Sequence, residues 1–394
     1  MIELTIMDHG PAFSAGVQEL VDRFQTEQRA DVRLRVLPWR GAWADFVKIG
    51  LYGDGPDVSE VGSTWVSEFA SMNALRPFVK ADVTEIGGPS RFLRAAWNSG
   101  TPYGQALTWA VPWQADTRIL HYRRDILERA GIDLGSAFLT AEALSQTLAG
   151  LRSAGVPSPW VVPTHRSRMT LHNVACWAWG AGGDFVSSDL KHTAFARPEA
   201  KAGIRAYFDL VRYLSPSARH LDESQSDALF WSGQAAMTIS GPWLMREAAI
   251  PPDVSAHVGR VLPPGAPYVG GTHLVIWKHT PQPDLALALV RLLAGKQAQA
   301  GFFEQLGILP THLDVLAEES FVTDPFYRTV SEGLKAGRSF PSFTLWGLIE
   351  NKLTEAFAAL WADVLAVPDP DVAALVDRHL NPAAQRLDST LAYQ

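Results

Sequence analysis

Tryptophan is the residue type whose chemistry stands out most in this chain. There are 14 Trp among 394 residues. A pyranose ring has an apolar C–H face and a rim of hydroxyl groups, so an indole can stack on the face while polar neighbours bind the rim. The abundance of Trp therefore indicates a carbohydrate ligand, although some of these side chains, such as Trp361, are expected in the core.

One of these residues, Trp243, occupies a position that a ligand could reach. Residues 235–239 are expected to form a short buried strand that stops at Ser240-Gly241-Pro242, and Trp243 begins an expected helix that continues to Ala248. A strand end followed by a helix start is where α/β folds bind ligands. We therefore expect Trp243 to be a stacking platform, meaning an indole face on which a ring can lie. The alternative is a core strand followed by a buried Trp.

The sequence contains no catalytic or metal-binding motif. It lacks a phosphate-binding GxxxxGK[ST], an HExxH and a GxSxG, and its 11 His residues do not have metal-ligand spacing. We therefore expect a binding protein and not an enzyme, with no catalytic residues, no metal and no cofactor. A glycoside hydrolase remains the alternative, because it needs only two carboxylates placed by the fold. Against it, a (β/α)8 barrel would need eight strand–helix pairs, and the sequence indicates fewer.

Composition and charge narrow the class of protein further. The hydrophobic content of 47% and charged content of 19% are those of a globular chain, and no apolar stretch approaches a membrane span. The net charge of −7 offers no basic footprint for nucleic acid. The single cysteine, Cys176, lies in an apolar run and is expected to be an inert core residue.

The N-terminal part of the chain alternates between strand and helix patterns. Residues 2–6 read as a strand, followed by a helix that carries Val17 and Phe24, a strand over 32–36, and a helix that carries Phe46. This β-α-β-α order predicts a largely parallel sheet with helices on its faces.

Three segments carry a resemblance to a known family. They are GQAAMTISGPW (233–243), YGQALTWAVPWQADTRILHYRRDI (from Tyr103) and RSFPSFTLWGLIENKLTEAFAALW (338–361). Together with shorter matches, these motifs fall in family order at about 110, 180, 240, 270, 310 and 346. The chain resembles the carbohydrate-binding solute-binding proteins of ABC importers, of the maltose-binding-protein type, over nearly its whole length. It departs from the family pattern at Arg123, where the family has Asn.

The resemblance implies the fold class and the domains. The fold would be α/β, of the two-lobed periplasmic-binding-protein type (type II), with a hinge and a ligand cleft between the lobes. Lobe 1 would contain residues 1–110 and 263–310, and lobe 2 would contain residues 111–262 and 311–394. The crossings are expected near Pro112, Pro263 and Pro310.

The resemblance also implies a set of ligand-binding residues, carried over position by position. Asp116 takes the acidic position, where a carboxylate can accept two sugar hydroxyls, and the alternative is a surface salt bridge. Arg338 could donate to hydroxyls or to an acidic group, with a surface Arg as the alternative. The full set is Asp8, His9, Trp39, Trp43, Trp65, Trp113, Asp116, Trp179, Gly180, Trp243, Gly271, Thr272, His273, Arg338 and Trp346.

The function that follows is capture of a sugar or sugar derivative and its delivery to the membrane permease subunits of an ABC importer. We expect a monomer without a nucleic-acid partner. The N-terminus shows no signal-peptide pattern, which leaves either a cytoplasmic protein or one whose signal peptide has been removed. The resemblance favours the second, so the expected location is periplasmic or extracellular. A cytoplasmic sensor of the same fold would need an attached DNA-binding domain, which the sequence does not show. The sequence leaves open whether the sugar is neutral or anionic.

Overall fold

The computed structural model describes residues 1–246 and 250–392 and divides into two compact units. Unit 1 contains Met1–Thr117 and Val269–Gly347, and unit 2 contains Arg118–Tyr268 and Leu348–Gln394. The mixed α/β fold class was predicted correctly.

The boundaries differ from the predicted ones, most of all at the third crossing. Residues 311–347 belong to unit 1, because their backbone bonds to it repeatedly. Thr311 N–H donates to Gln299 Oε1 at 2.7 Å, and Tyr103 N–H donates to the Ser342 carbonyl at 2.7 Å. Pro112 lies inside a strand and is not at a crossing.

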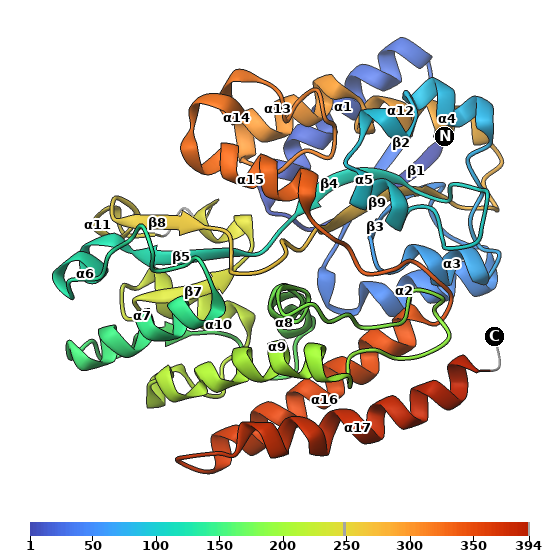
Figure 1. Ribbon diagram of the computed structural model, residues 1–394. Helices are drawn as coiled ribbons and strands as arrows, with labels where there is room; N and C mark the ends of the chain where they lie inside the picture. The colour runs from blue at the N-terminus through green and yellow to red at the C-terminus, as the bar shows by residue number, and fades with distance from the viewer. Residues whose placement is uncertain (247–249, 393–394) are drawn as a thin grey trace. The chain divides into compact units, whose positions relative to one another are not determined.

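Unit 1 is built on a five-stranded sheet in the order β2-β1-β3-β9-β4 (Figure 1). The first three strands are parallel, and β9 is antiparallel to both of its neighbours, β3 and β4. The strand bounds are β1 (Ile2–Met7), β2 (Val32–Leu37), β3 (Val58–Gly62), β4 (Val111–Asp116) and β9 (Gly270–Ile276).

Helices cover both faces of this sheet, because strand residues alternate between two apolar cores. Leu274 and Ile276 pack into the core that contains residues of α1 (Pro11–Gln28), α12 (Pro283–Ala294) and α13 (Lys296–Leu306). Val275 and Trp277 pack into the core with α2 (Trp39–Tyr52) and α3 (Val66–Ser71). The other helices of unit 1 are α4 (Lys80–Ile86), α5 (Arg94–Ser99), α14 (Glu319–Thr323), α15 (Pro325–Ala336) and the 3-10 turn Pro89–Arg91.

Unit 2 is built on a four-stranded sheet in the order β6-β7-β5-β8. Its strands are β5 (Ile119–Arg123), β6 (Trp160–Val161), β7 (Met237–Ser240) and β8 (Val258–Val261). Strand β5 is antiparallel to β7 and β8, whereas β6 is parallel to β7. Strands β6, β7 and β8 therefore end at the edge where β5 begins.

A helical layer packs beside this sheet in unit 2 (Figure 1). Phe208 of α9 (Pro198–Phe208) contacts Trp361 of α16 (Trp346–Ala366) with ring centroids 4.6 Å apart. The remaining helices are α6 (Arg124–Arg129), α7 (Ala141–Ser153), α8 (Arg168–Gly180), α10 (Glu223–Trp231), α11 (Pro252–Ser255) and α17 (Val372–Leu391), with 3-10 turns Asp209–Tyr213, Pro216–Ala218 and Pro242–Arg246. The helix expected to continue from Trp243 to Glu247 and Ala248 lies partly outside the described residues, and its described part is the last of these turns.

Two buried histidines make the stability of the fold sensitive to acid. Burial lowers the pKa of His121 to about 3, with the charge of Arg260 adding to the effect. Burial likewise lowers the pKa of His273 to about 4. The folded protein therefore holds both rings neutral at a pH where the unfolded chain protonates them.

We predict that His121→Leu flattens the acid side of the stability profile. Unfolding takes up a proton at His121 between its ordinary pKa of 6.5 and its folded value of about 3. The free energy of unfolding should thus fall with decreasing pH, by up to about 1.4 kcal/mol per pH unit for each such group. Urea unfolding of the wild type and the variant above and below pH 6.5 measures the difference. The exposed His192→Leu is the control, and an equally steep loss in His121→Leu would contradict the prediction.

Candidate functional site

The predicted site residues of unit 1 gather at one edge of its sheet. His9 follows β1, Trp39 follows β2, Trp65 follows β3 and Asp116 ends β4. Strand β9 begins at the same edge, since Gly62 pairs with Thr272 and Asp116 pairs with Gly270. The carboxyl ends of parallel strands are where α/β sheets bind ligands, so the fold places these residues at a suitable edge.

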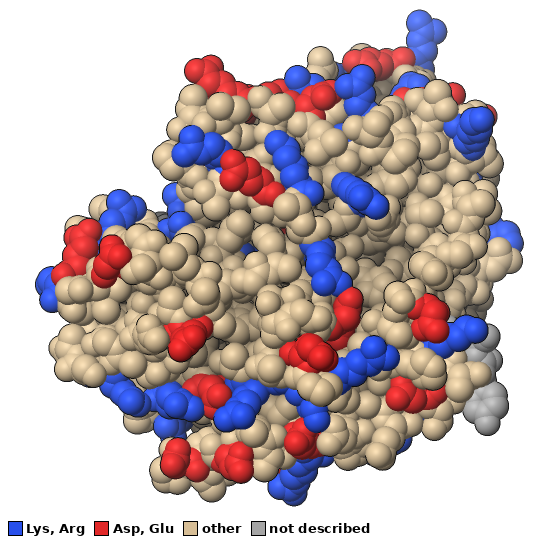
Figure 2. All heavy atoms as spheres, in the orientation of Figure 1, with Lys and Arg blue, Asp and Glu red and all other residues tan. Residues whose placement is uncertain are grey.

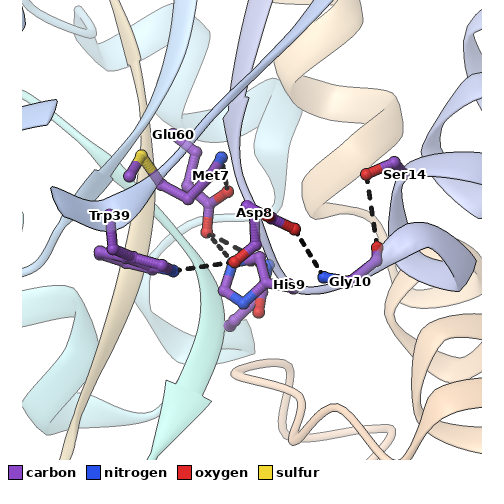
Figure 3. A network of polar contacts seen from close by, with 8 residues as sticks. Met7, Asp8, His9, Gly10, Ser14, Trp39 and Glu60 are labelled. Atoms are coloured by element: carbon purple, nitrogen blue, oxygen red, sulfur yellow. Dashed lines mark hydrogen bonds and ion pairs between the residues drawn. The ribbon is translucent and has the colours of Figure 1, made fainter. Parts of the chain in front are cut away.

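A buried glutamate, Glu60 of β3, organises this edge (Figure 3). Its Oε2 accepts from Met7 N–H at 2.7 Å. Its Oε1 lies 2.7 Å from His9 Nε2 and accepts from Gln114 Nε2 at 3.3 Å. Because Nε2 of His9 is committed to Glu60, only the other ring nitrogen, Nδ1, is left for a bond to a ligand.

Trp39 is the most exposed of the Trp residues predicted for this edge. Its side chain is 42% exposed, and its Nε1 donates to the Asp8 carbonyl at 3.1 Å. The Asp8 side chain is itself exposed and accepts from Gly10 N–H. The ring of Trp39 contacts His9 edge-on, with centroids 5.5 Å apart (Figure 3). Trp39 therefore offers an indole face next to the His9 imidazole.

Trp65 packs against Trp39, and Trp43 packs against Trp65. Trp43 stacks on Phe69 with centroids 5.2 Å apart, and Trp65 is buried in the same apolar core. The ring of Trp65 contacts Trp39 and Trp43 at 6.1 and 5.6 Å between centroids. This packing, together with the helical spacing of Trp43 to Phe46, indicates that Trp43 lies on the core face of α2.

Two predicted residues need correction, because their side chains bond and pack inside unit 1. Trp113 is 1% exposed, its Nε1 donates to the Leu293 carbonyl at 3.0 Å, and its ring packs on Phe13. His273 is also 1% exposed, and its Nε2 bonds the Ala96 carbonyl at 2.9 Å. Both side chains are therefore part of the packed and hydrogen-bonded interior of unit 1.

Thr272 and Trp346 are similarly buried, and like His273 Nδ1 they include a polar atom without a partner in the described part of the chain. Both are buried, yet Thr272 Oγ1 and Trp346 Nε1 have no hydrogen-bond partner among residues 1–246 and 250–392. The Trp346 ring stacks on Phe340, with centroids 4.6 Å apart. Since buried polar groups in proteins are normally bonded, these two atoms are candidates for bonding to a ligand.

Gly271, Asp116 and Arg338 complete the set in unit 1. A Cβ on Gly271 would lie 1.9 Å from the Gln114 carbonyl oxygen, and its φ is +127°, so the strand pairing requires glycine there. Asp116 is partly buried at the end of β4, and the Arg338 side chain is exposed. The Arg338 carbonyl accepts from Val269 N–H at 2.8 Å.

Trp243 lies in unit 2 at the sheet edge where β7 ends. Its Nε1 donates to Asp227 Oδ2 at 3.2 Å, and the Arg118 guanidinium lies 4.8 Å from its ring centroid. A Cβ on Gly241 would lie 2.0 Å from the ring atom Cζ3, so only glycine allows this ring position. The residue as a whole is partly buried.

An aromatic row lies in the same unit. Tyr268 stacks on His172 with centroids 4.6 Å apart and on Trp179 at 6.5 Å, and Arg118 lies 5.9 Å from its ring. Trp179 Nε1 donates to Asp184 Oδ1 at 3.1 Å. Gly180 packs closely on Gly265, where a Cβ would lie 2.6 Å from the Gly265 Cα, so this contact requires glycine.

Four residues of these arrangements were missed from the sequence: Glu60, Arg118, Asp227 and Tyr268. Glu60 and Arg118 left a signal, because each is a charged residue next to or within an expected buried strand. Asp227 left none, since it lies in a continuous polar stretch, residues 223–227, that also carries Glu223. Among the described residues, no His, Cys, Asp and Glu side chains form a group that could hold a metal ion. No described helix has the length and apolarity to cross a bilayer.

We predict that Glu60→Ala destabilises unit 1. The change leaves the Met7 N–H and the Gln114 amide without their acceptor, which should cost about 3 kcal/mol of unfolding free energy. Denaturant unfolding measures this loss. The control is Glu3→Ala, since the Glu3 ion pairs with Arg33 and Arg35 lie at the surface and should contribute less than about 1 kcal/mol. Equal losses in the two variants would contradict the prediction.

Comparison with known proteins fits this geometry. The chain is 20% identical over 384 residues, 92% of this chain and 85% of the relative, to the diacetylchitobiose binding protein DasA of Streptomyces coelicolor. An ABC transporter solute-binding protein from Thermotoga lettingae, bound with alpha-D-tagatose, has a TM-score of 0.84 at 20% identity and 99% coverage of both chains. The sugar-binding protein MalE from Xanthomonas citri has a TM-score of 0.82 at 23% identity, covering 100% of this chain and 97% of that one.

The matched family is the decisive finding. Its profile, described as bacterial extracellular solute-binding protein, matches residues 10–300, well over half of the chain. The chain belongs to the family of bacterial extracellular solute-binding proteins.

Proposed function

We propose that this chain is the substrate-binding protein of an ABC importer that takes up a sugar or a sugar derivative. The observation that carries the proposal is Trp243, a partly buried residue whose indole is fixed at the end of β7 by Asp227 and Arg118. The relatives and structural neighbours, which include sugar-binding proteins, support it.

The chemistry of the two candidate edges suits a polyhydroxylated ring. Trp39 and Trp243 offer apolar faces for its C–H groups. Beside Trp39, His9 offers a ring nitrogen, and Asp116 at the same sheet edge offers carboxylate oxygens that can accept hydroxyl hydrogen bonds. We propose that these residues, together with Asp8, Thr272, Trp179, Arg338 and Trp346, bind the ligand directly, and that Trp43 and Trp65 support them.

We also propose that the protein binds the sugar without converting it. The family and the named relatives are binding proteins, which favours this reading over the glycoside hydrolase. The proposed partners are the permease subunits of the importer, and the proposed location is periplasmic or extracellular, with the protein acting as a monomer. On the face drawn in Figure 2, positive and negative side chains are interspersed.

A thermal-shift screen with neutral and acidic sugars identifies the ligand. At about a hundredfold excess over the dissociation constant, a ligand should stabilise the folded state by about 2.7 kcal/mol. Chromatography of the best-binding sugar after long incubation with the protein should recover it unchanged. Steady appearance of product would overturn the binding-protein proposal in favour of a hydrolase.

We predict that Trp243→Ala weakens sugar binding much more than it weakens folding. Loss of the stacked ring should remove about 1–3 kcal/mol of binding free energy. Calorimetry with the sugar and denaturant unfolding without it measure the two effects. The control Tyr52→Ala removes another aromatic ring, 79% exposed at the end of α2, and should change neither quantity. If Trp243 is instead a core residue, the replacement should lower the free energy of unfolding by about 3–5 kcal/mol. The protein would then be badly destabilised, while its folded fraction would bind the sugar normally.

Closure of the two lobes on the ligand remains a prediction of the family resemblance. Small-angle scattering should give a smaller radius of gyration with saturating sugar than without it. The same measurement on Trp243→Ala at the same sugar concentration should show a smaller change. An unchanged radius in the saturated wild type would count against closure.

A further inference from the structure

Asp227 is a buried carboxylic acid that lies beside the ring of Trp243. It is on α10 and only 8% exposed. Its Oδ2 accepts from Trp243 Nε1 at 3.2 Å and from Ser240 Oγ at 3.3 Å. Helix α10 packs on β7, so it carries this carboxyl group to the end of the strand from which Trp243 follows. Asp227 therefore sets the direction in which the N–H edge of the indole points.

Gly241 and Arg118 also restrict the Trp243 ring, but neither residue changes its charge with pH. Gly241 lies directly against the ring, and the Arg118 guanidinium is 4.8 Å from its centroid. Arg118 stays protonated at any ordinary pH, and glycine has no titratable group. Of the groups described here that contact Trp243, only the Asp227 carboxyl can change its charge.

The surroundings of Asp227 raise its pKa, so that the carboxyl group changes its charge near neutral pH. Burial raises the pKa of Asp227 to about 6, and the nearby Glu223 on the same helix adds to this effect, whereas the two hydrogen bonds and Arg118 oppose it. Glu223 itself accepts a hydrogen bond from Ser167 Oγ. On the neighbouring strand β5, His121 stays neutral. The charged groups that face Asp227 are thus Glu223 from α10 and Arg118 from the segment before β5.

We propose that Asp227 is a positioning residue that holds Trp243 in its sugar-binding orientation, and that the charge of Asp227 makes sugar affinity depend on pH. This inference rests on the proposed function. The ionised carboxylate accepts a charge-assisted hydrogen bond from the indole, which is stronger than a bond to a neutral acid. Protonation of Asp227 weakens the bond and loosens the ring, so the affinity should fall about fivefold as the pH drops from about 7.5 to about 5.

The first experiment tests the link between Asp227 and Trp243 without any ligand. Near-ultraviolet circular dichroism is followed from about pH 8 to about pH 4.5, and the spectrum of Trp243→Phe is subtracted to isolate Trp243. The wild type should show a transition with a midpoint at about 6. The transition should be absent in Asp227→Asn, which keeps an acceptor oxygen but cannot ionise. The control Asp377→Asn, at a surface ion pair with Lys201, should retain it.

The second experiment measures sugar affinity by calorimetry at the two pH values, with the best sugar from the thermal-shift screen. The wild type should lose about fivefold in affinity at the lower pH, and Asp227→Asn should bind equally at both. Trp243→Phe lacks the N–H donor and should also be insensitive to pH, so the test does not depend on the folding of Asp227→Asn. A pH dependence that persists in both variants would overturn the proposal, as would a dichroism transition that persists in Asp227→Asn. If the wild type binds no sugar at either pH, the proposed function fails, and the dichroism titration still decides the link between Asp227 and Trp243.

Discussion

A buried carboxylate can exist in the interior of unit 1 only because several donors converge on it. Glu60 is 0% exposed, and its oxygens are bonded by Met7 N–H, His9 and Gln114. These donors come from the end of β1, the loop after it and β4. The Glu60 side chain therefore joins β3 to residues 7–9 and to β4. These hydrogen bonds together hold the edge of the sheet in shape.

Unit 2 repeats this principle with different residues. A buried acid on a helix, Asp227, bonds the indole that follows β7, as Glu60 bonds the imidazole that follows β1. In both units a ring side chain stands at the end of a strand, and a carboxyl group behind it fixes its direction. Rings held in this way lose little conformational freedom when they bind a ligand, which favours affinity.

The sequence predicted the fold class and the order of the early elements well, because the alternation of apolar residues is strong in Ile2–Ile6 and in residues 32–36. It placed Trp39 and Trp243 at strand ends for the same reason. It failed for Trp113, because the motif around Pro112 does not reveal that helices cover this strand and that the ring packs on Phe13 and Phe302. It also missed Asp227 and Tyr268, since their importance lies in contacts with Trp243 and His172 that are distant in sequence.

The position of β9 in its sheet has a consequence for the order in which the chain can fold. This strand lies between β3 and β4, although the whole unit 2 segment from Arg118 to Tyr268 separates it from them in sequence. While the chain emerges from a ribosome, β3 and β4 therefore lack their shared partner until residues 270–276 have been made. Unpaired strand edges of this kind bind other chains readily. The five-stranded sheet of unit 1 can thus be completed only after the unit 2 segment has been made.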